Sequence, residues 1–266
     1  MLDANCFWFG DGLSDLELIC LLSMVRQGHR VRLFSYEKLQ NVPAGIENPD
    51  AREVLPREEL IFYRANGSPA LGANRFRCRL MKKGLGLWLD TDMLLLKPIH
   101  RDDDYIFGWQ GPNLVNNAVL YLPPDAKITD ELLKFTSQNH PIPPFYEPAH
   151  RADLERRKAA GAPVDVRDLP WGVYGPMALT YFVLRNRLQH HARPPEIFYP
   201  VHWSAIETLF SSKENDGNLI RESTIGVHLW NTYLRAKYPA GLTVEKGCFV
   251  EEFAREQLGI ALKRLL

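Results

Sequence analysis

The sequence predicts an α/β protein in which short strands and helices alternate along the chain. Two patterns support this prediction. Short apolar runs bounded by glycine or proline are typical of buried strands, and the segments between them carry apolar residues at helical spacing. The chain has 266 residues, of which 45% are hydrophobic and 24% charged, as in an ordinary globular protein. This length allows one large domain or two small ones.

Composition excludes several classes of protein. The 32 basic side chains balance 32 acidic ones, which argues against a general nucleic-acid binder but leaves room for one local polyanion pocket. The four cysteines lie far apart without a C-x-x-C pair, so we expect no disulfide scaffold, no cysteine zinc site and a reducing, cytoplasmic location. No apolar run approaches the ~20 residues of a membrane span. Asp3 stands where a secretion signal would carry basic residues.

The first 36 residues predict a β-α-β unit. An apolar strand is expected over 6–9, and Ser14 followed by Glu17 forms a capping box that opens a helix. Gly28 is placed to end this helix, and the alternating residues 31–36 predict a second strand. In nucleotide-binding domains that begin this way, the ligand lies at the carboxyl ends of the strands.

A second unit follows. Residues 70–83 predict a helix that Gly84 ends, residues 87–89 predict a buried strand, and 93–96 continue apolar until Lys97-Pro98. The remaining expected elements are strands at 105–109, 118–122 and 226–229 and helices at 130–137, 176–188 and 250–258.

The stretch from about 140 to 170 differs from the rest of the chain. It holds prolines at 141, 143, 144, 148, 163 and 170, and residues 151–158 within it are strongly charged. We expect a loop-rich insertion with one or two solvated helical turns. It would serve either as a lid over a site or as a surface excursion with no role.

The most informative pattern is the pair Asp90 and Asp92 after the strand at 87–89. In an extended chain these two side chains point the same way, so both carboxylates can converge on one point. Two neighbouring anions repel, and a divalent cation such as Mg²⁺ or Mn²⁺ removes that cost and can bridge to a phosphate. The alternative is a polar turn with two solvated aspartates. The apolar segments on both sides favour the metal site, because a buried carboxylate pair is costly without a partner.

The region around this pair contains an ordered series of blocks: Gly67-Ser68-Pro69-Ala70, Asn74, Phe76-Arg77, the run from Gly86 to Asp92, and Leu96-Lys97-Pro98. The series resembles the D-x-D region of glycosyltransferase family 32. This family is related to the glucosyltransferase domains of large clostridial toxins and to α-1,4-glycosyltransferases.

Three further blocks resemble the same family. Trp8-Phe9-Gly10 is similar to its N-terminal W-I-G element, Asn116-Asn117-Ala118-Val119 to its N-N-A strand, and Val227-His228-Leu229-Trp230-Asn231 to its late H-x-W/N block. The match extends from about residue 5 to 235. The ordered set of blocks is more specific than any single block.

The resemblance implies a GT-A-like fold over residues 1–266, with a central mixed, mostly parallel sheet flanked by helices and the insertion at about 140–170. It implies a retaining, metal-dependent transferase that moves a hexose or N-acetylhexosamine from a UDP-sugar to a glycan or lipid-linked saccharide, as in polysaccharide biosynthesis. No nucleophile can be nominated from the sequence. A front-face route, in which the departing phosphate oxygen assists the acceptor hydroxyl, would not require one.

The same resemblance assigns roles to individual residues. Asp92 would ligate Mn²⁺ or Mg²⁺ directly, Asp90 would contribute to the metal site and hold the ribose or donor sugar, and His228 would be a further metal ligand. Asp90, Asp92 and Arg77 are thus the expected catalytic residues. The expected donor-binding residues are Trp8, Phe9, Asn74, Arg77, Asp90, Asn117 and Trp230.

For four of these residues the sequence also allows a purely structural role. Arg77 would then be an exposed arginine on a helix and Trp8 a core tryptophan. His228 would be a core histidine with its hydrogen bonds satisfied, and Asn117 would satisfy backbone groups at a strand edge.

One departure from the family pattern bears on the donor. Asn74 stands where the family usually has an aspartate, and Cys78 replaces the usual aromatic residue. Asparagine keeps a carbonyl acceptor but loses the charge and adds a donor, so the affinity for the donor or its identity can shift.

Two other functions stay open. A haloacid-dehalogenase-like phosphatase would use Asp90 as a nucleophile, but the apolar run 93–96 replaces the polar turn which that chemistry favours. The other open function is that of a relative that binds a sugar nucleotide but has lost transfer activity. Its support is Asn74, which departs from the family pattern. The amphipathic C-terminal stretch 253–266 either packs back on the domain, which we expect, or rests as a helix on a membrane surface.

Overall fold

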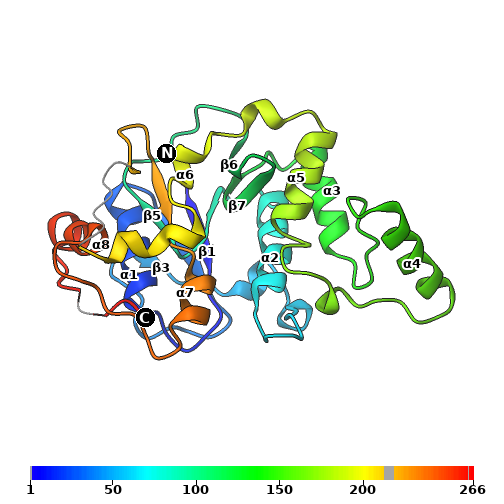
Figure 1. Cartoon of the computed structure of the whole chain (residues 1–266), viewed down its shortest axis with the longest axis horizontal. Helices are drawn as coiled ribbons and strands as arrows, with labels where there is room; N and C mark the ends of the chain where they lie inside the picture. The colour runs from blue at the N-terminus through cyan, green and yellow to red at the C-terminus, as the bar shows by residue number, and fades with distance from the viewer. Residues whose placement is uncertain (1, 213–218, 263) are drawn as a thin grey trace.

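The computed structural model describes residues 2–212, 219–262 and 264–266 and shows a central sheet with helices on both faces (Figure 1). The six strands have the order β3-β2-β1-β4-β7-β6, and a separate pair is formed by β5 and β8. The strands are β1 (Ala4–Phe7), β2 (Val31–Phe34), β3 (Ile46–Glu47), β4 (Leu87–Leu89), β5 (Met93–Leu95), β6 (Ile106–Gly111), β7 (Leu114–Tyr121) and β8 (Gly226–His228). The predicted α/β architecture, with a mixed and mostly parallel sheet flanked by helices, is confirmed.

The main helices are α1 (Asp15–Arg26), α2 (Ala70–Lys82), α3 (Lys127–Thr136), α4 (Pro148–Ala159), α5 (Pro176–Arg185), α6 (Pro195–Phe198), α7 (Asn231–Lys237) and α8 (Phe249–Phe253). Shorter 3₁₀ or π turns are η1 (Ala51–Glu53), η2 (Arg57–Glu59), η3 (Val166–Asp168), η4 (Gln189–His191), η5 (Trp203–Phe210) and η6 (Ala254–Leu258). In the described part of the chain, no helix is long and apolar enough to span a bilayer.

The N-terminal β-α-β unit forms as predicted, with one shift. The Ser14 N–H donates to the Glu17 carboxylate at 2.8 Å, and Gly28 ends the helix region with a φ of +83°. The first strand covers 4–7 rather than 6–9, because β1 pairs with β2 through this range and with β4 at its first two residues. Trp8 and Phe9 therefore follow the strand's carboxyl end instead of lying within it.

The D-x-D segment is not extended, which corrects the sequence interpretation. The Met93 N–H donates to the Asp90 carbonyl at 3.0 Å, so residues 90–93 form a tight turn. This turn takes the chain out of the main sheet, and β5 then pairs antiparallel with β8. The two carboxylates still converge, but the turn and the second sheet bring them together rather than the pleat of one strand.

Other boundaries differ from the prediction because tertiary contacts set them. The strand expected at 118–122 begins at Leu114, since β6 and β7 form one long hairpin. The helix expected at 176–188 ends at Arg185, and Arg187 has a φ of 59°. The short elements β3, α6 and α7 carry too little periodicity to be predicted.

The segment at 140–170 contains a full helix, α4, where one or two turns were expected. Among the residues of α4 only Leu154 is buried. The helix projects from the body at the edge of the molecule (Figure 1). The end of the segment is tied to the loop after η2, because Arg64 pairs with both Asp165 and Asp168.

The strands alternate their side chains between two apolar layers. On β1, Cys6 packs in the layer that contains Met24 of α1. On the other face Phe7 stacks on Phe76 of α2, with ring centroids 4.7 Å apart. This period-2 alternation holds helices on both faces and leaves the ends of the strands free for a site.

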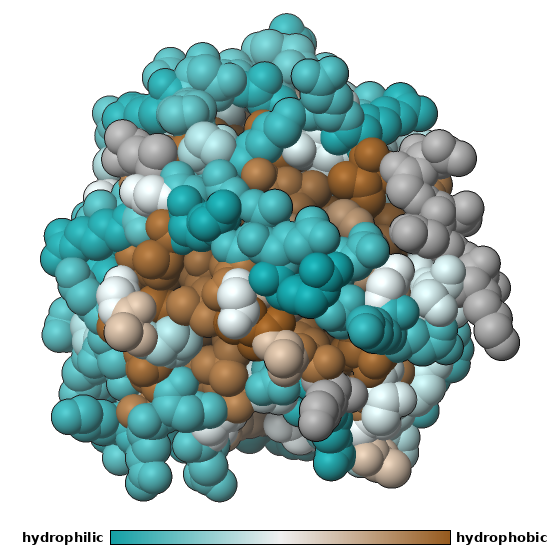
Figure 2. All heavy atoms as spheres, turned by 90° about the vertical axis from the view of Figure 1, so that its left-hand side faces the viewer, coloured by the Kyte–Doolittle hydropathy of each residue, from teal (hydrophilic) through white to brown (hydrophobic). Residues whose placement is uncertain are grey.

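The C-terminal stretch packs back on the domain, as expected, but it is not one helix. The helical part ends at Leu258, where Gly259 adopts a φ of +70°. Beyond it Leu262 and Leu265 are buried, and the Leu16 N–H donates to the Leu265 carbonyl. Figure 2 shows the side of the molecule that carries α8, where apolar patches lie between hydrophilic residues.

Replacing Gly72 with alanine should destabilise the fold by about 1–3 kcal/mol or more. A Cβ at this position of α2 would lie 2.5 Å from Leu60 Cδ1 and 2.7 Å from the Ile61 carbonyl oxygen, and backbone has little freedom to yield. Urea unfolding measures the loss. Gly111→Ala is the matched control, since nothing lies within 4 Å of its Cβ and it should change stability little. Equal stability of the two variants would contradict the proposed close approach.

Candidate active site

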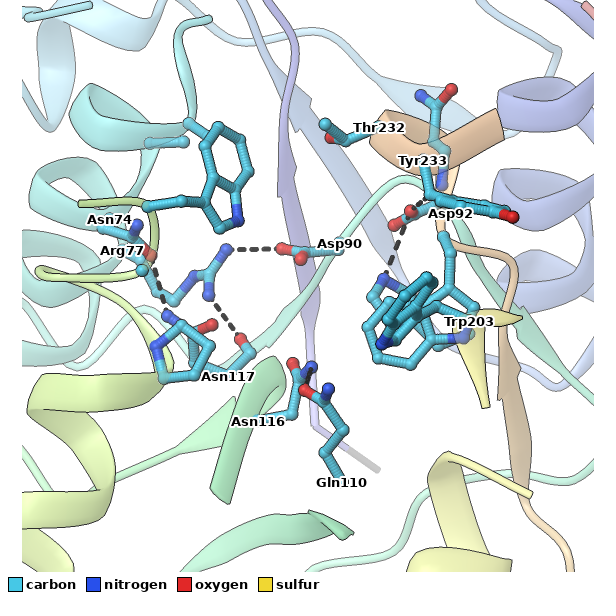
Figure 3. A pocket seen from close by; sticks show the side chains of 18 of the residues that line it. Asn74, Arg77, Asp90, Asp92, Gln110, Asn116, Asn117, Trp203, Thr232 and Tyr233 are labelled. Atoms are coloured by element: carbon cyan, nitrogen blue, oxygen red, sulfur yellow. Dashed lines mark hydrogen bonds and ion pairs between the residues drawn. The ribbon is translucent and has the colours of Figure 1, made fainter. Parts of the chain in front are cut away.

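A cavity of about 580 Å³ opens where β1 and β4 end. Its walls come from segments far apart in the sequence: α2 and the start of α5 on one side, the β6–β7 hairpin below, and η5 with α7 on the other side. In Figure 3, Asn74, Arg77 and Asn117 lie on one side of Asp90, whereas Trp203 and Tyr233 lie on the other. The volume falls in the range typical of sites for small molecules.

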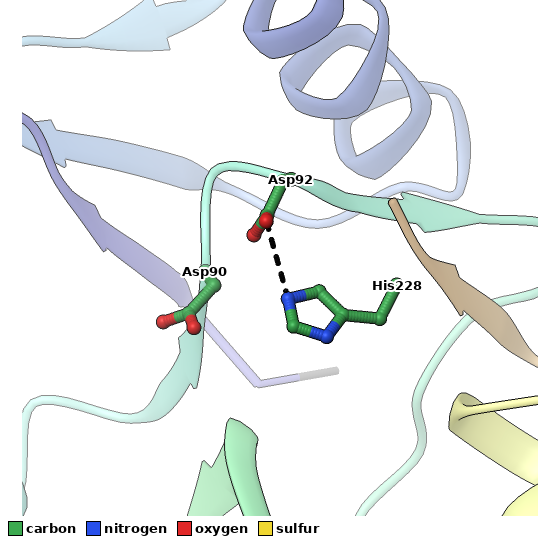
Figure 4. Close-up of side chains that lie close together, drawn as sticks. All are labelled: Asp90, Asp92 and His228. Atoms are coloured by element: carbon green, nitrogen blue, oxygen red, sulfur yellow. Dashed lines mark ion pairs between the residues drawn. The ribbon is translucent and has the colours of Figure 1, made fainter. Parts of the chain in front are cut away.

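Asp90, Asp92 and His228 meet in the wall of this cavity (Figure 4). One potential ligand atom of each lies within 4.8 Å of the other two. The pairing of β5 with β8 explains this, because Met93 stands opposite His228 and Asp92 directly precedes Met93. His228 Nε2 lies 3.2 Å from Asp92 Oδ2.

Asp92 is held as an anion. Burial raises the pKa of its carboxyl, but the charge of His228, a hydrogen bond from that ring and the Asn231 N–H outweigh burial and leave the pKa below its usual value. The Asn231 N–H donates to Asp92 Oδ2 at 2.8 Å. An ionised carboxylate is the form that binds a metal ion.

Asp90 has the opposite tendency. Burial raises its pKa, the Arg77 guanidinium lowers it, and the negative charge of Asp92 raises it again, with a net increase. Its Oδ1 accepts hydrogen bonds from Arg77 and from the Trp88 indole N–H. The two carboxyls of the pair therefore differ in environment, and a nearby cation would relieve the repulsion that raises the pKa of Asp90.

Arg77 is a buried, fixed cation. Only 5% of its side chain is exposed, and its guanidinium donates to the Asn117 carbonyl at 2.6 Å and lies 4.5 Å from the centroid of the Trp88 ring. Its Nε has no hydrogen-bond partner in the structure. The alternative of an exposed helix arginine is thus wrong for Arg77, and one donor of the buried group is left unused.

Asn74 and Asn117 form a carboxamide pair beside Arg77. Asn117 Nδ2 donates to Asn74 Oδ1 at 2.7 Å, so the acceptor that asparagine shares with aspartate is the atom in use. A Cβ at Gly175 would lie 3.1 Å from Asn74 and 3.3 Å from Asn117. Glycine at the start of α5 thus makes room for this pair.

His228 and Trp230 pack together on the opposite wall. Their ring centroids are 4.1 Å apart, and the Trp230 indole N–H donates to the Val201 carbonyl at 3.1 Å. Trp230 has a left-handed backbone with φ 53°, which turns the chain from β8 into α7. His228 is buried, but its Nδ1 has no partner, so it is not a satisfied core histidine.

Glu17 is a site residue that the sequence interpretation missed. It was assigned only to the capping box, yet it is fully buried on α1 and accepts hydrogen bonds from Asn231 Nδ2 at 2.6 Å and Arg235 at 2.9 Å. It thereby fixes the start of α7, whose Asn231 N–H contacts Asp92. No local signal distinguishes this role, since the partners lie more than 200 positions away.

We expect Glu17→Gln to lower stability by about 1.5–3 kcal/mol, because the amide cannot accept every hydrogen bond that the buried carboxylate accepts. If the site binds UDP with a metal ion, as the resemblance to family 32 implies, that binding should also weaken, because the Asn231 N–H then loses its fixed position beside Asp92. Urea unfolding and calorimetry measure the two effects. Glu37→Gln, at a side chain 86% exposed, should change neither. Unaltered UDP binding by a destabilised Glu17→Gln would separate Glu17 from the site.

Trp8 and Phe9 do not line the cavity, unlike the other predicted donor-binding residues. Trp8 packs in the apolar layer on the α1 face, with the Arg235 guanidinium 5.9 Å from its ring centroid. Phe9 contacts Phe62 with ring centroids 5.1 Å apart and is 37% exposed. Their roles toward a nucleobase therefore stay predictions.

Other lining residues were left out of the sequence interpretation, among them the large side chains of Tyr63, Gln110, Trp171, Trp203 and Tyr233. Most of them belong to loops or to short helical turns, where no periodicity marks a functional position. Aromatic character is the only sequence feature that four of them share.

Comparisons with known proteins bear on this arrangement. Residues 170–257, which contribute β8 and α7 with His228 and Trp230, match the family model described as "Alpha 1,4-glycosyltransferase conserved region". This part of the chain is similar to the α-1,4-glycosyltransferases. The resemblance to family 32 that the sequence blocks indicate is thereby confirmed.

Two other comparisons add little to this relationship. No curated protein matches the chain. Among solved structures, this chain is similar to one named "PaToxG Glycosyltransferase". The two share 12% sequence identity over 69% of this chain and 68% of that chain, with a TM-score of 0.46. A likeness at this level carries no argument about function.

Proposed function

We propose that the protein is a metal-dependent, retaining glycosyltransferase that transfers a hexose or N-acetylhexosamine from a UDP-sugar to a glycan acceptor. The convergence of Asp90, Asp92 and His228 in one wall of a ligand-sized cavity carries the proposal. Arg77 lies beside Asp90, so the same wall offers both a cation site and a fixed positive charge. A sugar diphosphate needs both. We further propose that residues 1–266 act as one GT-A-like domain.

The three side chains fit a divalent metal ion. Two carboxylates supply hard oxygen ligands, as Mg²⁺ and Mn²⁺ prefer, and the imidazole suits Mn²⁺ better than Mg²⁺. Burial, and then the negative charge of Asp92, raise the pKa of Asp90, and the Nδ1 of buried His228 has no partner. A bound cation or its water can relieve both of these costs. When bound, the metal stabilises the charge that develops on the leaving diphosphate.

The protein's own residues perform the other tasks. Arg77 is positioned before any ligand arrives, because Asp90 and the Asn117 carbonyl hold it, and it places a permanent charge near the diphosphate. The Asn74–Asn117 pair presents amide groups that can hydrogen-bond to sugar hydroxyls. Trp230 and Trp88 cover the site with apolar surface and limit the access of water.

A front-face route is consistent with the carboxylates available. Among the cavity-lining residues, all of which the structure describes, only Asp90 and Asp92 carry carboxylates. Both belong to the proposed metal site, so neither is free to act as a separate nucleophile. The retained configuration would then arise when the departing phosphate oxygen accepts the proton of the acceptor hydroxyl on the same face of the sugar.

One set of experiments separates this proposal from the two alternatives. Calorimetry with UDP should show binding that requires Mn²⁺, and a panel of UDP-sugars should show metal-dependent release of UDP with at least one sugar. Binding of UDP without any release would favour the inactive relative. Hydrolysis of p-nitrophenyl phosphate, lost in Asp90→Asn, would favour the phosphatase.

The acceptor and the cellular location are also matters of proposal. A glycan or lipid-linked saccharide, in the biosynthesis of a polysaccharide in the cytoplasm, fits the predicted chemistry. Contact with a membrane through the C-terminal stretch would have to use residues other than Leu262 and Leu265, which are buried. Flotation with anionic liposomes, with and without Ile260→Glu, tests that contact. Equal flotation of both proteins, or none, would exclude it.

A further inference from the structure

We propose that Trp171 and Trp203 form two apolar platforms for an uncharged saccharide, the acceptor, on the open side of the cavity. This inference rests on the proposed glycosyltransferase function and names the chemical class of its second substrate. It depends on features of the cavity other than the Asp90–Asp92–His228 cluster.

The first observation is exposure. Among the described residues, five large hydrophobic side chains are exposed: Phe9, Trp171, Leu184, Trp203 and Leu219. Both tryptophans of this set line the cavity, and the other three do not. Trp171 is 49% exposed and Trp203 is 41% exposed. Exposure of a tryptophan forgoes more hydrophobic free energy than exposure of most other residues, because its side chain is large. Exposed apolar side chains gathered at a cavity indicate a binding surface.

The second observation is that Trp171 is held in place before a ligand binds. Its ring stacks on Tyr63 with centroids 4.9 Å apart and an interplanar angle of 26°. The Gly172 N–H donates to the Tyr63 hydroxyl at 3.0 Å, which fixes the loop that follows Trp171. One face of the indole is therefore covered and its orientation set, while about half of the side chain stays exposed.

Trp203 is supported in a similar way on another wall. It begins η5, and its ring lies 5.3 Å from that of Tyr233 and 5.0 Å from that of His202. In Figure 3 the Trp203 side chain lies on the Asp92 side of the cavity, away from Arg77 and Asn74. A platform that neighbouring rings hold rigid binds a ligand at a low cost in conformational entropy.

The chemistry of these walls suits a sugar ring. A pyranose has a face of C–H groups that packs on an aromatic ring and hydroxyls at its edge that require hydrogen bonds. Amide groups lie in the same cavity, where Asn116 Nδ2 donates to Gln110 Oε1 at 2.7 Å and Asn116 Oδ1 accepts from the Ala118 N–H. The Gln110 amide nitrogen remains as a donor for a ligand.

The charges of the cavity indicate that the bound ring is neutral. Apart from His228, the charged residues among the lining residues are Arg77, Asp90 and Asp92, and they contact one another or His228. The wall around Trp171 and Trp203 thus offers no unpaired cation for an acidic sugar and no unpaired anion for an amino sugar. A neutral hexose is the ligand class that this surface would take.

Binding of saccharides to the full chain, without UDP or metal, tests the proposal directly. The probes are methyl glycosides of neutral hexoses and the matching uronides, followed by tryptophan fluorescence and calorimetry. We expect binding of at least one neutral glycoside, weaker binding of its uronide by about 10-fold, and about 10-fold or greater loss in Trp171→Ala and Trp203→Ala. The phenylalanine variants should restore part of the affinity, since they keep an aromatic face.

Leu184→Ala is the matched control, because it removes an exposed apolar side chain outside the cavity and should bind saccharide as the wild type does. Circular dichroism checks that each variant folds. If neither tryptophan variant lowers saccharide affinity while both lower affinity for UDP–Mn²⁺, the platforms hold the donor and the proposal is wrong. Equal binding of uronides would overturn the neutral-ligand assignment. Saccharide binding that depends on both tryptophans, in a protein that never releases UDP from any UDP-sugar, would uphold the platforms and reject the transferase function.

Discussion

Replacing Asp92 with asparagine should abolish Mn²⁺-dependent binding of UDP and lower the rate of UDP release from a UDP-sugar by about 10²–10³-fold. The neutral amide is a poor metal ligand, and it leaves the cluster with one carboxylate instead of two. Asp92 Oδ2 also accepts the Asn231 N–H at 2.8 Å and lies 3.2 Å from His228 Nε2. An amide nitrogen at that position would face the Asn231 donor instead of accepting from it.

Titration calorimetry with UDP, run with and without Mn²⁺, measures the binding, and a coupled assay of UDP release measures the rate. Asp102→Asn is the matched control, since its side chain is 62% exposed, pairs with Arg193 and lies outside the cavity. It should bind and react as the wild type does. Normal affinity of Asp92→Asn for UDP–Mn²⁺ would remove Asp92 from the metal site and with it the main support for the proposed function.

Replacing Arg77 with methionine should lower the free energy of unfolding by about 3 kcal/mol, the lower end of the range for breaking a buried ion pair, because the Arg77 side chain is 5% exposed whereas that of Asp90 is 27% exposed. Methionine fills much of the same space, so the loss comes chiefly from Asp90, whose Oδ1 would keep only the Trp88 N–H as a partner. The Asn117 carbonyl would also lose its donor. The double variant Arg77→Met/Asp90→Asn should recover part of the stability, because it no longer buries an unpaired charge.

Urea unfolding at neutral pH without metal measures this cycle. Arg79→Met, two positions further along α2, is the control: its side chain is 25% exposed and pairs with Glu59, which is 39% exposed. A pair at the surface should contribute about 0–1 kcal/mol. If the Arg77 and Arg79 variants lose equal stability, or if the double variant is no better than Arg77→Met alone, the Arg77–Asp90 pair is not the buried ion pair that the structure indicates.

Asp92 and Arg77 lie in the same wall of the cavity, but their replacement should have different effects. In the proposed function Asp92 binds the metal ion, so its replacement should affect function more than folding. Arg77 is needed by the fold as well as by the proposed donor site, because it joins α2 to both Asp90 and β7. A buried cation held by the protein alone would already be in place when the proposed diphosphate ligand binds, so this side chain would not have to be reorganised at that moment.

The substitution of asparagine at position 74 can now be given a structural meaning. Asn74 uses its carbonyl oxygen to accept from Asn117, and the added amide group lies close enough to Gly175 that a Cβ there would come within 3.1 Å. A shift in donor preference, which the sequence suggested, would then act through hydrogen bonding of this neutral pair rather than through a pairing of residue 74 with Arg77.

Local patterns in the sequence predicted the parts of the fold that depend on neighbours in the chain. The capping box at Ser14 and Glu17, the helix that begins at Ala70 and the apolar strand before Asp90 all appear within a few residues of their predicted places. Each is set by periodicity, a cap or a glycine, and these act over one or two turns. The two carboxylates of the candidate metal site were recognisable for the same reason, since two carboxylates between apolar runs form a local signal.

The tertiary structure alone decided how these parts form a cavity. The pairing of β5 with β8, the buried carboxylate of Glu17 under α7, and the separation of Trp8 from the cavity all depend on contacts between residues far apart in the chain. The D-x-D turn is closed by a local hydrogen bond, but distant segments hold it, since the Asp90 N–H donates to the Ala118 carbonyl and the Asp92 carbonyl accepts from the Leu229 N–H. The same is true of Trp171 and Trp203, which stand in segments without periodicity. Such contacts are chosen by burial and hydrogen bonding over the whole molecule, and a local pattern contains no record of which distant segment will supply the partner.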